Sequence, residues 1–500
     1  MKAKNPPAKP DGIGIDFGTT NSVIAKAIRS GQGVTTGALS EPHPSVVWYQ
    51  PNESPKVGKI AKDNLLGFSE AAGNYFVSSV KQTFGKENRF SIFGRKVTST
   101  DVASEIFTHL KHNAKITNNL DVTEAVVTIP IDFDGRARQE LRKAADLAGI
   151  YIKTFIHEPF AAIVGYCYGQ KDQRTLLDRE GENILVFDWG GGTLDVTLGR
   201  IEGNSLVELG TKGLAGRSGD YFDGRLSNEV KSQFIKRQKI SADELKLTAS
   251  TKDRLRAECE KCKISLSELT EHEVMVAQFY RNGLHAINLE ELVERSTFEG
   301  LIRNDVQEAI GLIDSVLDQA GLKDSDVDLV LLIGGTSRIP LVRGEMYNRF
   351  GTKMVHVKNA DTIIAEGAAA VDALGLYPAL ARTVCVELSD ESHYEIFKAG
   401  DLAKPDVCYK EVLFFCTDNR DGQARLVVKE KLGRSTTRFE TKDVLSIPVS
   451  AALPKPFNHE RVRASFALDD DLILRVSASG AIFPAGAQTE IYDLCFSLKA

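Results

Sequence analysis

The sequence has few cysteines and no long apolar run. Seven cysteines in 500 residues are too few for a disulfide framework, so a reducing compartment fits the composition. No stretch of 18 residues is apolar throughout, and the opening residues 1–10 lack the apolar region of a signal peptide. We therefore expect a cytoplasmic protein whose residues 1–11 form a disordered tail.

The chain also lacks a strong net charge. Its 62 basic and 68 acidic residues leave a formal charge of −6, which gives no electrostatic reason to expect nucleic acid or a membrane as a partner. The one Cys-x-x-Cys pair, Cys259 and Cys262, has no second pair that would complete a zinc site. We expect two buried thiols on a helix instead.

The most informative stretch is residues 184–198, Ile-Leu-Val-Phe-Asp-Trp-Gly-Gly-Gly-Thr-Leu-Asp-Val-Thr-Leu. An apolar strand ends at Asp188, three glycines follow, and Thr193 begins an alternating strand, which predicts a β-hairpin. The glycines leave backbone N–H groups open to phosphate oxygens. Asp188 and Asp195 would repel bare phosphate, so they indicate hydrated Mg²⁺ between them and the phosphate. A tight glycine hairpin with solvated aspartates explains this stretch equally well on its own.

A second copy of the pattern decides between these two interpretations. Residues 12–25 also contain an apolar strand, then Asp16, a glycine, two threonines and a β-rich continuation. Two strands that each end in such a turn predict a duplicated phosphate clamp, with one hairpin on each side. This pattern resembles the actin, sugar-kinase and Hsp70 ATPase superfamily. The single-loop motifs G-x-x-x-x-G-K-[ST] and strand-linked G-x-G-x-x-G are absent.

Strands and helices alternate over residues 12–378, which predicts an α/β nucleotide-binding domain. From about residue 383 the pattern changes to short β-runs, which predicts a separate all-β sandwich over residues 384–500 after a short linker at 379–383. The expected strands of the first domain lie at 124–130, 151–156, 264–290 and 328–333, and the expected helices at 101–120, 133–149, 242–263, 291–320 and 361–374. The β-runs of the second domain lie at 411–416, 423–430, 444–449, 461–468, 471–476 and 488–498.

Several candidate residues also have a plain structural explanation. Glu158 follows a strand and opens a helix, where site residues of open α/β sheets often lie, but a first-turn acid also complements a helix dipole. Lys81 could be a solvated surface lysine. Glu260 and Lys263 could form a surface ion pair at i,i+3, worth roughly 0.2–0.5 kcal/mol.

The chain resembles the Hsp70 (DnaK-like) chaperones through seven segments in family order. They begin at Gly14, Val127, Glu158, Phe187, Glu260, Leu332 and Asn359. The resemblance implies a two-lobed, duplicated actin-like ATPase fold followed by a peptide-binding β-sandwich. It implies an ATPase that couples hydrolysis to protein folding and binds unfolded or extended polypeptide. It also implies ATP or ADP, Mg²⁺ and K⁺ as cofactors, with a J-domain co-chaperone and a nucleotide exchange factor as partners.

The same resemblance implies a role for each matching residue. The catalytic residues would be Asp16, Lys81, Glu158, Asp188 and Thr193, and the metal ions would be held by Asp16, Asp188 and Asp195. The nucleotide would contact Gly18, Thr19, Thr20, Asn21, Gly190, Gly191, Gly192, Gly219, Glu260, Lys263, Ser267, Gly334, Gly335, Arg338 and Asp361. Pro130 and Arg138 match the family's interlobe allosteric switch.

Three features depart from the family pattern. The sequence stops at Ala500, where the helical lid of the family would begin, so we expect a short form that exchanges peptide quickly. Residues 377–383 replace the acidic, leucine-rich linker, and Ser218 replaces a glycine near the phosphates. An ATP-binding scaffold or exchange factor, with weak hydrolysis and no coupled peptide release, is the main alternative. A small-molecule kinase and an actin-like filament protein are further alternatives, and the β-domain argues against the kinase.

Overall fold

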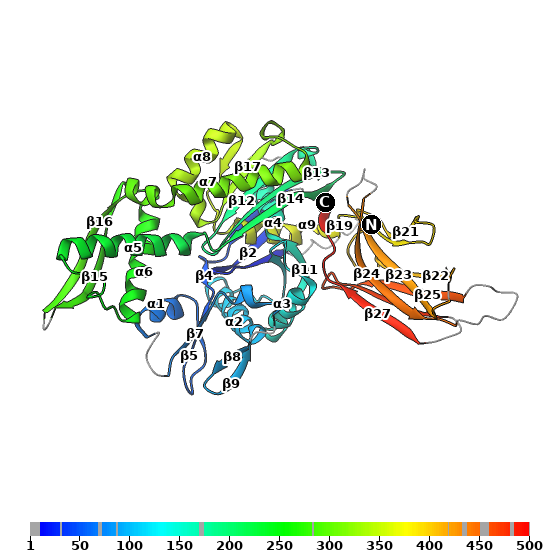
Figure 1. Ribbon diagram of the computed structural model, residues 1–500, viewed down its shortest axis with the longest axis horizontal. Coiled ribbons are helices and arrows are strands. Elements are labelled where there is room, and N and C mark those ends of the chain that lie inside the picture. The colour runs from blue at the N-terminus through cyan, green and yellow to red at the C-terminus, as the bar shows by residue number, and fades with distance from the viewer. Residues whose placement is uncertain are drawn as a thin grey trace, which may run out of the picture.

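The structure is a computed structural model, and Figure 1 shows its arrangement. The predicted N-terminal tail lies outside the described residues, except for residue 11. The described residues are 11–30, 33–68, 73–86, 89–169, 175–282, 285–418, 420–432, 438–450, 460–480 and 485–499.

The first sheet is built from the N-terminal part of the chain. Its six strands follow the order β11-β10-β1-β2-β3, with β4 paired to β2. β1 and β2 form an antiparallel hairpin, and β10 and β11 extend the sheet in parallel, with α3 (Gly135–Leu147) as the crossover between them. The strands are β1 (Gly12–Phe17), β2 (Asn21–Ser30), β3 (Gly33–Ala38), β4 (His43–Pro44), β10 (Glu124–Ile129) and β11 (Tyr151–His157).

The second sheet repeats this local plan. β12 and β13 form an antiparallel hairpin, and β17 pairs in parallel with β12, as β10 does with β1. The seven strands follow the order β18-β17-β12-β13-β14-β28-β19. They are β12 (Asn183–Trp189), β13 (Thr193–Glu202), β14 (Ser205–Ala215), β17 (Leu329–Ile333), β18 (Met354–His356), β19 (Tyr377–Leu380) and β28 (Phe496–Lys499). The structure thus confirms a glycine hairpin in each of two sheets.

Two helices join the sheets. α4 (Glu158–Gly169) and α9 (Ile363–Leu374) pack against each other, and α9 lies on β1, β2 and β3. The contact is close enough to require glycine: a Cβ on Gly14 would lie 2.2 Å from the Ala369 nitrogen, and one on Gly367 would lie 1.7 Å from the Ala161 oxygen. The small residues of α4 and α9 allow both sheets to pack closely on these helices in one apolar cluster.

The remaining helices cover the outer faces of the two sheets. α2 (Ser99–Asn118) and α3 pack on the first sheet, whereas α5 (Gly219–Gln238), α6 (Ala249–Ser265), α7 (Arg295–Ala320) and α8 (Pro340–Phe350) share a core with the second. Smaller elements are α1 (Lys59–Phe68), β5 (Val46–Tyr49), β6 (Lys56–Val57), β7 (Tyr75–Ser78), β8 (Arg89–Ile92) and β9 (Arg95–Thr98). None of the helices in the described ranges is long and apolar enough to cross a membrane.

Two predicted helix boundaries are wrong. The charged helix begins at residue 249 rather than 242, because the Thr248 hydroxyl caps α6 by accepting from the Thr251 N–H. Residues 291–294 end strand β16 (His285–Glu294), which pairs with β15 (Glu271–Asn282), rather than beginning α7. The other expected helices lie within a few residues of their predicted limits.

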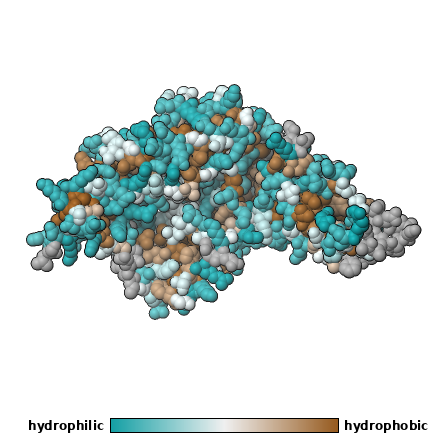
Figure 2. Space-filling model, viewed as in Figure 1, coloured by the Kyte–Doolittle hydropathy of each residue, from teal (hydrophilic) through white to brown (hydrophobic). Residues whose placement is uncertain are grey.

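The last part of the chain forms two four-stranded antiparallel sheets around one apolar cluster. These two sheets lie at one end of the molecule in Figure 1. The face of the whole molecule seen in Figure 2 is largely hydrophilic, with separate apolar patches. One sheet has the order β21-β20-β23-β24 and the other β22-β25-β26-β27. The strands are β20 (Val384–Glu387), β21 (His393–Phe397), β22 (Tyr409–Cys416), β23 (Gln423–Lys431), β24 (Phe439–Pro448), β25 (Glu460–Leu468), β26 (Leu474–Gly480) and β27 (Gly486–Ile491).

The expected run at residues 488–498 is two strands rather than one. β27 belongs to the β-rich part, but the chain breaks at residues 492–495 and then forms β28 in the seven-stranded sheet. β28 lies between β14 and β19, and pairs with β19 from Tyr377↔Lys499 to Leu380↔Phe496. The expected strand at 471–476 is likewise shifted, since β26 begins at Leu474.

Candidate functional site

The two glycine hairpins border one cleft of about 480 Å³. Every residue predicted for catalysis, metal or nucleotide lines this cleft, although the residues come from segments up to 345 positions apart (from Asp16 to Asp361). Pro130 and Arg138 do not line it. The structure therefore brings these residues together from both hairpins, the turn at residues 80–83, α4, α5, α6 and the segments after β17 and β18.

The glycine hairpin of the second sheet is held by close backbone contacts. Gly334 follows β17 with φ +77°, and a Cβ there would lie 2.4 Å from the Trp189 oxygen. The Thr336 hydroxyl donates to the Gly190 oxygen at 2.8 Å, and the Gly190 N–H donates to the Thr193 oxygen at 3.0 Å. The turn is therefore fixed before any ligand arrives.

Four carboxylates and one lysine meet at the centre of the cleft. Asp16 is the next-to-last residue of β1 and Asp188 the next-to-last residue of β12, whereas Asp195 lies on β13 and Glu158 begins α4. Lys81 lies in the 3₁₀ turn η1 (Val80–Thr83), is 7% exposed, and forms an ion pair with Glu158. The structure thus contradicts the interpretation of Lys81 as a solvated surface side chain.

The carboxylates are not balanced by this one lysine. Burial and the charge of Glu158 raise the pKa of Asp16 to about 6, against the lowering effects of Lys81 and Thr128. Burial with the charges of Glu158, Asp195 and Asp16 raises the pKa of Asp188 well above its usual value. Burial acts to lower the pKa of Lys81, but Glu158 and Asp16 outweigh it and raise the pKa overall. The cleft therefore favours an added cation.

The residues present fit Mg²⁺ with a phosphate group. Within the described ranges, no three His, Cys, Asp or Glu side chains are arranged to hold a metal by themselves. Mg²⁺ does not need such a set, because it usually keeps several waters and binds through one or two carboxylates plus substrate phosphates. Asp16 and Asp188 would supply the carboxylates, and the glycines of both hairpins leave room for phosphate oxygens.

A metal-free stability measurement tests the excess negative charge. Burial and the charge of Glu158 raise the pKa of Asp195 to about 6, so the folded state resists its ionisation. Because this group binds a proton more tightly when folded, its ionisation costs stability above pH 6 and nothing below its ordinary value of 3.8. We expect Asp195→Asn, in urea unfolding with EDTA, to be more stable at pH 7.5 by up to about 3 kcal/mol.

The gain of Asp195→Asn should shrink steadily between pH 6 and pH 4. Asp63→Asn is the matched control, because Asp63 is exposed on α1 and its replacement should change little. A destabilised Asp195→Asn at pH 7.5 in EDTA would show that the carboxylate is already compensated without a cation.

The opposite side of the cleft is bordered by α6 and by the segments after β17 and β18. Glu260 pairs with Lys62 at 2.9 Å, and Lys263 donates to Asp223 at 2.9 Å, so the i,i+3 pair between Glu260 and Lys263 is absent. Ser267 lies just beyond the end of α6. Arg338 and Asp361 form an ion pair at 2.6 Å across the mouth of the cleft. Cys259 and Cys262 are buried on α6, as expected.

The sequence alone missed several residues that hold the side chains and turns of the cleft in place. The Thr128 hydroxyl donates to the Asp16 carboxylate at 2.7 Å, and the parallel register Ile15↔Val127 of β1 and β10 is what aligns them. Asp223 and Thr336 were missed because their partners, Lys263 and Gly190, come from distant segments. The Asp-x-Gly repeats gave no signal for them.

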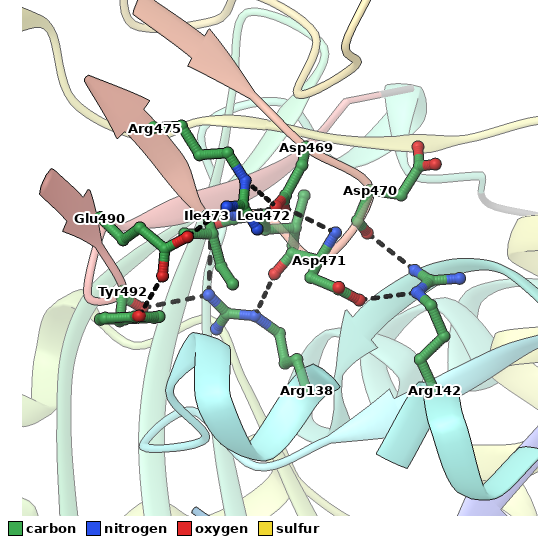
Figure 3. Close-up of polar contacts among 10 residues, drawn as sticks. All are labelled: Arg138, Arg142, Asp469, Asp470, Asp471, Leu472, Ile473, Arg475, Glu490 and Tyr492. Carbon is green, nitrogen blue, oxygen red and sulfur yellow. Dashed lines mark hydrogen bonds and ion pairs between the residues drawn. The ribbon is translucent and has the colours of Figure 1, made fainter. Parts of the chain in front are cut away.

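Arg138 lies away from the cleft, at the seam between α3 and the β-rich part of the chain (Figure 3). It is 3% exposed and donates to the Phe133 oxygen at 2.6 Å and to the Asp471 oxygen at 2.6 Å. The remaining guanidinium nitrogen, Nη2, donates to the carbonyl oxygens of Leu472 and Tyr492 at 3.2 and 3.1 Å. The predicted switch residue therefore contacts the loop between β25 and β26 and the segment that follows β27.

Further contacts strengthen this seam. Arg142 pairs with the Asp471 carboxylate at 2.6 Å and donates to the Asp470 oxygen at 2.8 Å. The Gly135 N–H donates to the Tyr492 oxygen at 3.2 Å, and a Cβ at Gly135 would lie 2.5 Å from Ile473. Pro130, the other predicted switch residue, lines a second cleft that adjoins the first. The seam and this second cleft therefore both involve the segment from β10 to α3.

The fold and the cleft define a class of protein: a mixed α/β molecule with two glycine hairpins facing each other over buried carboxylates. Comparison with models of protein families matches residues 87–482 to the family described as Hsp70 protein, and the chain belongs to the Hsp70 family. It is similar to the Chaperone protein DnaK of Thermosipho melanesiensis, with 28% identity over 478 residues. That alignment covers 93% of this chain and 77% of the relative. The Chaperone protein DnaK of Thermotoga maritima is 29% identical over 480 residues, covering 93% and 78%.

Proposed function

We propose that this protein is an ATP-dependent chaperone of the Hsp70 type. It binds and hydrolyses ATP in the cleft between the two hairpins, and it binds unfolded or extended polypeptide on its β-rich part. The observation that carries the proposal is the meeting of Asp16, Asp188 and Lys81 between two fixed glycine turns. The names of the DnaK relatives support the chaperone activity.

The domain arrangement is part of the proposal. Residues 12–378 would form a two-lobed actin-like nucleotide-binding domain, supported by the repeated plan of hairpin plus parallel strand. The linker predicted at 379–383 would be shortened to 381–383, because β19 extends to Leu380. The β-sandwich for peptide, predicted over 384–500, would end with β27, because β28 joins the seven-stranded sheet; the shared cluster of its two sheets supports it. The proposal also includes a cytoplasmic location, with a J-domain co-chaperone and a nucleotide exchange factor as partners.

Each cleft residue has a chemical task in this proposal. Asp16 and Asp188 would hold hydrated Mg²⁺, which supplies charge neutralisation for the phosphates, and Asp16 with Asp195 would lie near K⁺. Lys81 would neutralise the terminal phosphate, while Glu158 would orient the attacking water. The phosphates would be cradled by Gly18, Thr19, Thr20, Asn21, Gly190, Gly191, Gly192 and Thr193. The adenosine would lie among Gly219, Glu260, Lys263, Ser267, Gly334, Gly335, Arg338 and Asp361.

Arg138 and Pro130 would link nucleotide state to peptide affinity. Both residues follow β10, whose Thr128 hydroxyl donates to Asp16. A movement of Asp16 would therefore be transmitted through β10 to the seam. Arg138 then acts on the loops at Leu472 and Tyr492. Peptide would bind the β-rich part by backbone hydrogen bonds and side-chain pockets.

One observation favours the second candidate, an ATP-binding scaffold or exchange factor. β28 inserts between β14 and β19, so the chain beyond β27 is a strand of the nucleotide-binding sheet. The β-rich part is therefore joined to that sheet by two short connections, residues 381–383 and 492–495. A molecule joined in this way would bind ATP without releasing peptide faster.

Release of a fluorescent peptide, with and without ATP·Mg²⁺, tests the two candidates. Wild type, Thr193→Ala and the control Thr197→Ala are compared; Thr197 lies on the same strand, but its hydroxyl faces Thr211. Faster release on adding ATP, lost in Thr193→Ala alone, supports the chaperone. Identical release throughout, with ATP binding measured separately, rules out coupling and leaves the scaffold.

A further inference from the structure

Ser218 carries a buried hydroxyl that has no partner. The residue is 1% exposed, and its Oγ makes no hydrogen bond to any described group. Ser218 is the N-cap of the 20-residue helix α5, yet its side chain does not cap the helix. A serine there usually accepts from a backbone N–H of the first turn. A buried polar group without a partner costs free energy, so a ligand is the natural explanation.

The backbone around Ser218 is already fully engaged. The Gly219 N–H donates to the Gly190 oxygen at 3.3 Å, and the Asp220 N–H to the Gly191 oxygen at 2.9 Å. The backbone N–H groups of Tyr221 and Phe222 both donate to the carbonyl oxygen of Ser218 at 3.0 Å. The start of α5 is therefore attached to the glycine hairpin, and the Ser218 hydroxyl remains as a free donor.

The loop that carries Ser218 is also held in place from outside. The Trp189 indole N–H donates to the Arg217 oxygen at 3.1 Å, and Trp189 packs edge-on against Phe222. The Arg217 side chain pairs with Glu308 and lies 3.9 Å from Asp305 on α7. The hydroxyl therefore has a fixed position, which lowers the entropy cost of binding a ligand.

Ser218 lines a second cleft, of about 1300 Å³, next to the first. Lys81, Glu158 and the hairpin residues 191–193 line both clefts, so the two are joined at the hairpin. Lys231 and Lys252 line the far wall, and neither has an ion-pair partner in the part of the chain that the structure describes. This side of the hairpin thus offers free cations and a free donor to an anion.

We propose that the Ser218 hydroxyl binds the terminal phosphate of ATP and holds the free phosphate after hydrolysis. The proposal rests on the proposed function, in which the water oxygen bonds to the terminal phosphorus and the bond from phosphorus to the bridging oxygen breaks. ADP keeps the electron pair of that bond, and the proton of the attacking water passes to solvent. The second cleft is then the path by which phosphate departs, past Lys231 and Lys252. Ser218 is a ligand-binding residue that sets phosphate affinity and leaves ADP affinity unchanged.

Inhibition of ATP turnover by added inorganic phosphate, with ADP affinity measured in parallel, tests this role. In Ser218→Ala and Ser218→Gly, we expect the phosphate inhibition constant to rise about tenfold, the usual loss for one hydrogen bond to a charged group. ADP affinity should not change. Thermal stability should not fall, because the hydroxyl has no protein partner to lose.

Ser227→Ala is the matched control, since Ser227 lines the same cleft but its hydroxyl already donates to the Asp223 oxygen at 2.7 Å. Equal phosphate inhibition in wild type and both Ser218 variants overturns the proposal. If wild type fails to bind ATP, the proposed function is wrong, and direct binding of inorganic phosphate is compared instead. Binding to wild type that is lost in both variants then still supports the hydroxyl, and equal binding overturns it.

Discussion

Replacing Lys81 with alanine should lower ATP turnover by at least about a hundredfold, the usual effect of removing a donor aimed at developing phosphate charge. Lys81 is buried beside four carboxylates, and its pKa is raised by Glu158 and Asp16, so it is charged at neutral pH. Without it, the terminal phosphate would face Asp16 and Asp188 with no fixed cation from the protein. Single-turnover hydrolysis separates this effect from ATP affinity.

Lys86→Ala is the matched control for this variant. Lys86 lies in the same segment, but it is exposed, and among the described residues it donates to the Gln82 oxygen at 3.0 Å. Its replacement should leave turnover within about twofold, since exposed charges contribute little. Turnover in Lys81→Ala equal to that of wild type would mean that hydrolysis does not take place between the hairpins.

Replacing Arg138 with alanine should release the β-rich part from α3 at a cost of roughly 3 kcal/mol or more, because each hydrogen bond from a charged group contributes about 1.5–3 kcal/mol. The Asp471, Leu472 and Tyr492 oxygens would lose their donor, and the pairing of Arg142 with Asp471 would remain. Hydrogen exchange of the residue 469–476 loop and strand should therefore rise strongly. ATP should no longer change peptide release, if the seam carries the coupling.

Arg136→Ala gives a graded comparison on the same helix. Arg136 is exposed and its guanidinium lies over the Tyr492 ring at 4.9 Å, a contact worth roughly 0.5–1 kcal/mol. It should change exchange at the seam only slightly. Unchanged protection of residues 469–476 in Arg138→Ala would show that β28 alone keeps the β-rich part docked.

The glycine hairpins could be predicted because their signal is local. A strand followed by aspartate, glycine and threonine fits few structures other than a tight hairpin. Because the pattern occurs at both Asp16 and Asp188, a chance match does not explain it. Glu158 could also be placed, since Pro159 in the first turn marks where α4 begins. These residues then fall into one cleft, as the two sheets bring their hairpins together.

The partners of the charged residues could not be predicted. Glu260 and Lys263 satisfy the i,i+3 spacing, yet α1 supplies Lys62 to one and α5 supplies Asp223 to the other. Side chains from other elements provided better geometry than the helix's own neighbour. The same holds for Ser218, whose unpartnered hydroxyl is visible only after all its neighbours have been placed.

The route of the chain after β27 was hidden for a different reason. Residues 488–498 alternate like one strand, and the break at 492–495 contains no glycine or proline. It is tertiary pairing with Tyr377–Leu380 that separates β28 from β27. Sequence pattern predicts that a segment is extended, and it does not specify which sheet the strand joins.

A crystal structure with a non-hydrolysable ATP analogue and Mg²⁺ would show where the nucleotide binds. We expect phosphates between the two hairpins, Mg²⁺ next to Asp16 and Asp188, and the terminal phosphate within hydrogen-bonding distance of Lys81. The adenosine should lie between α6 and the segment that follows β17. Nucleotide bound elsewhere, or phosphates contacting one hairpin alone, would contradict this expectation.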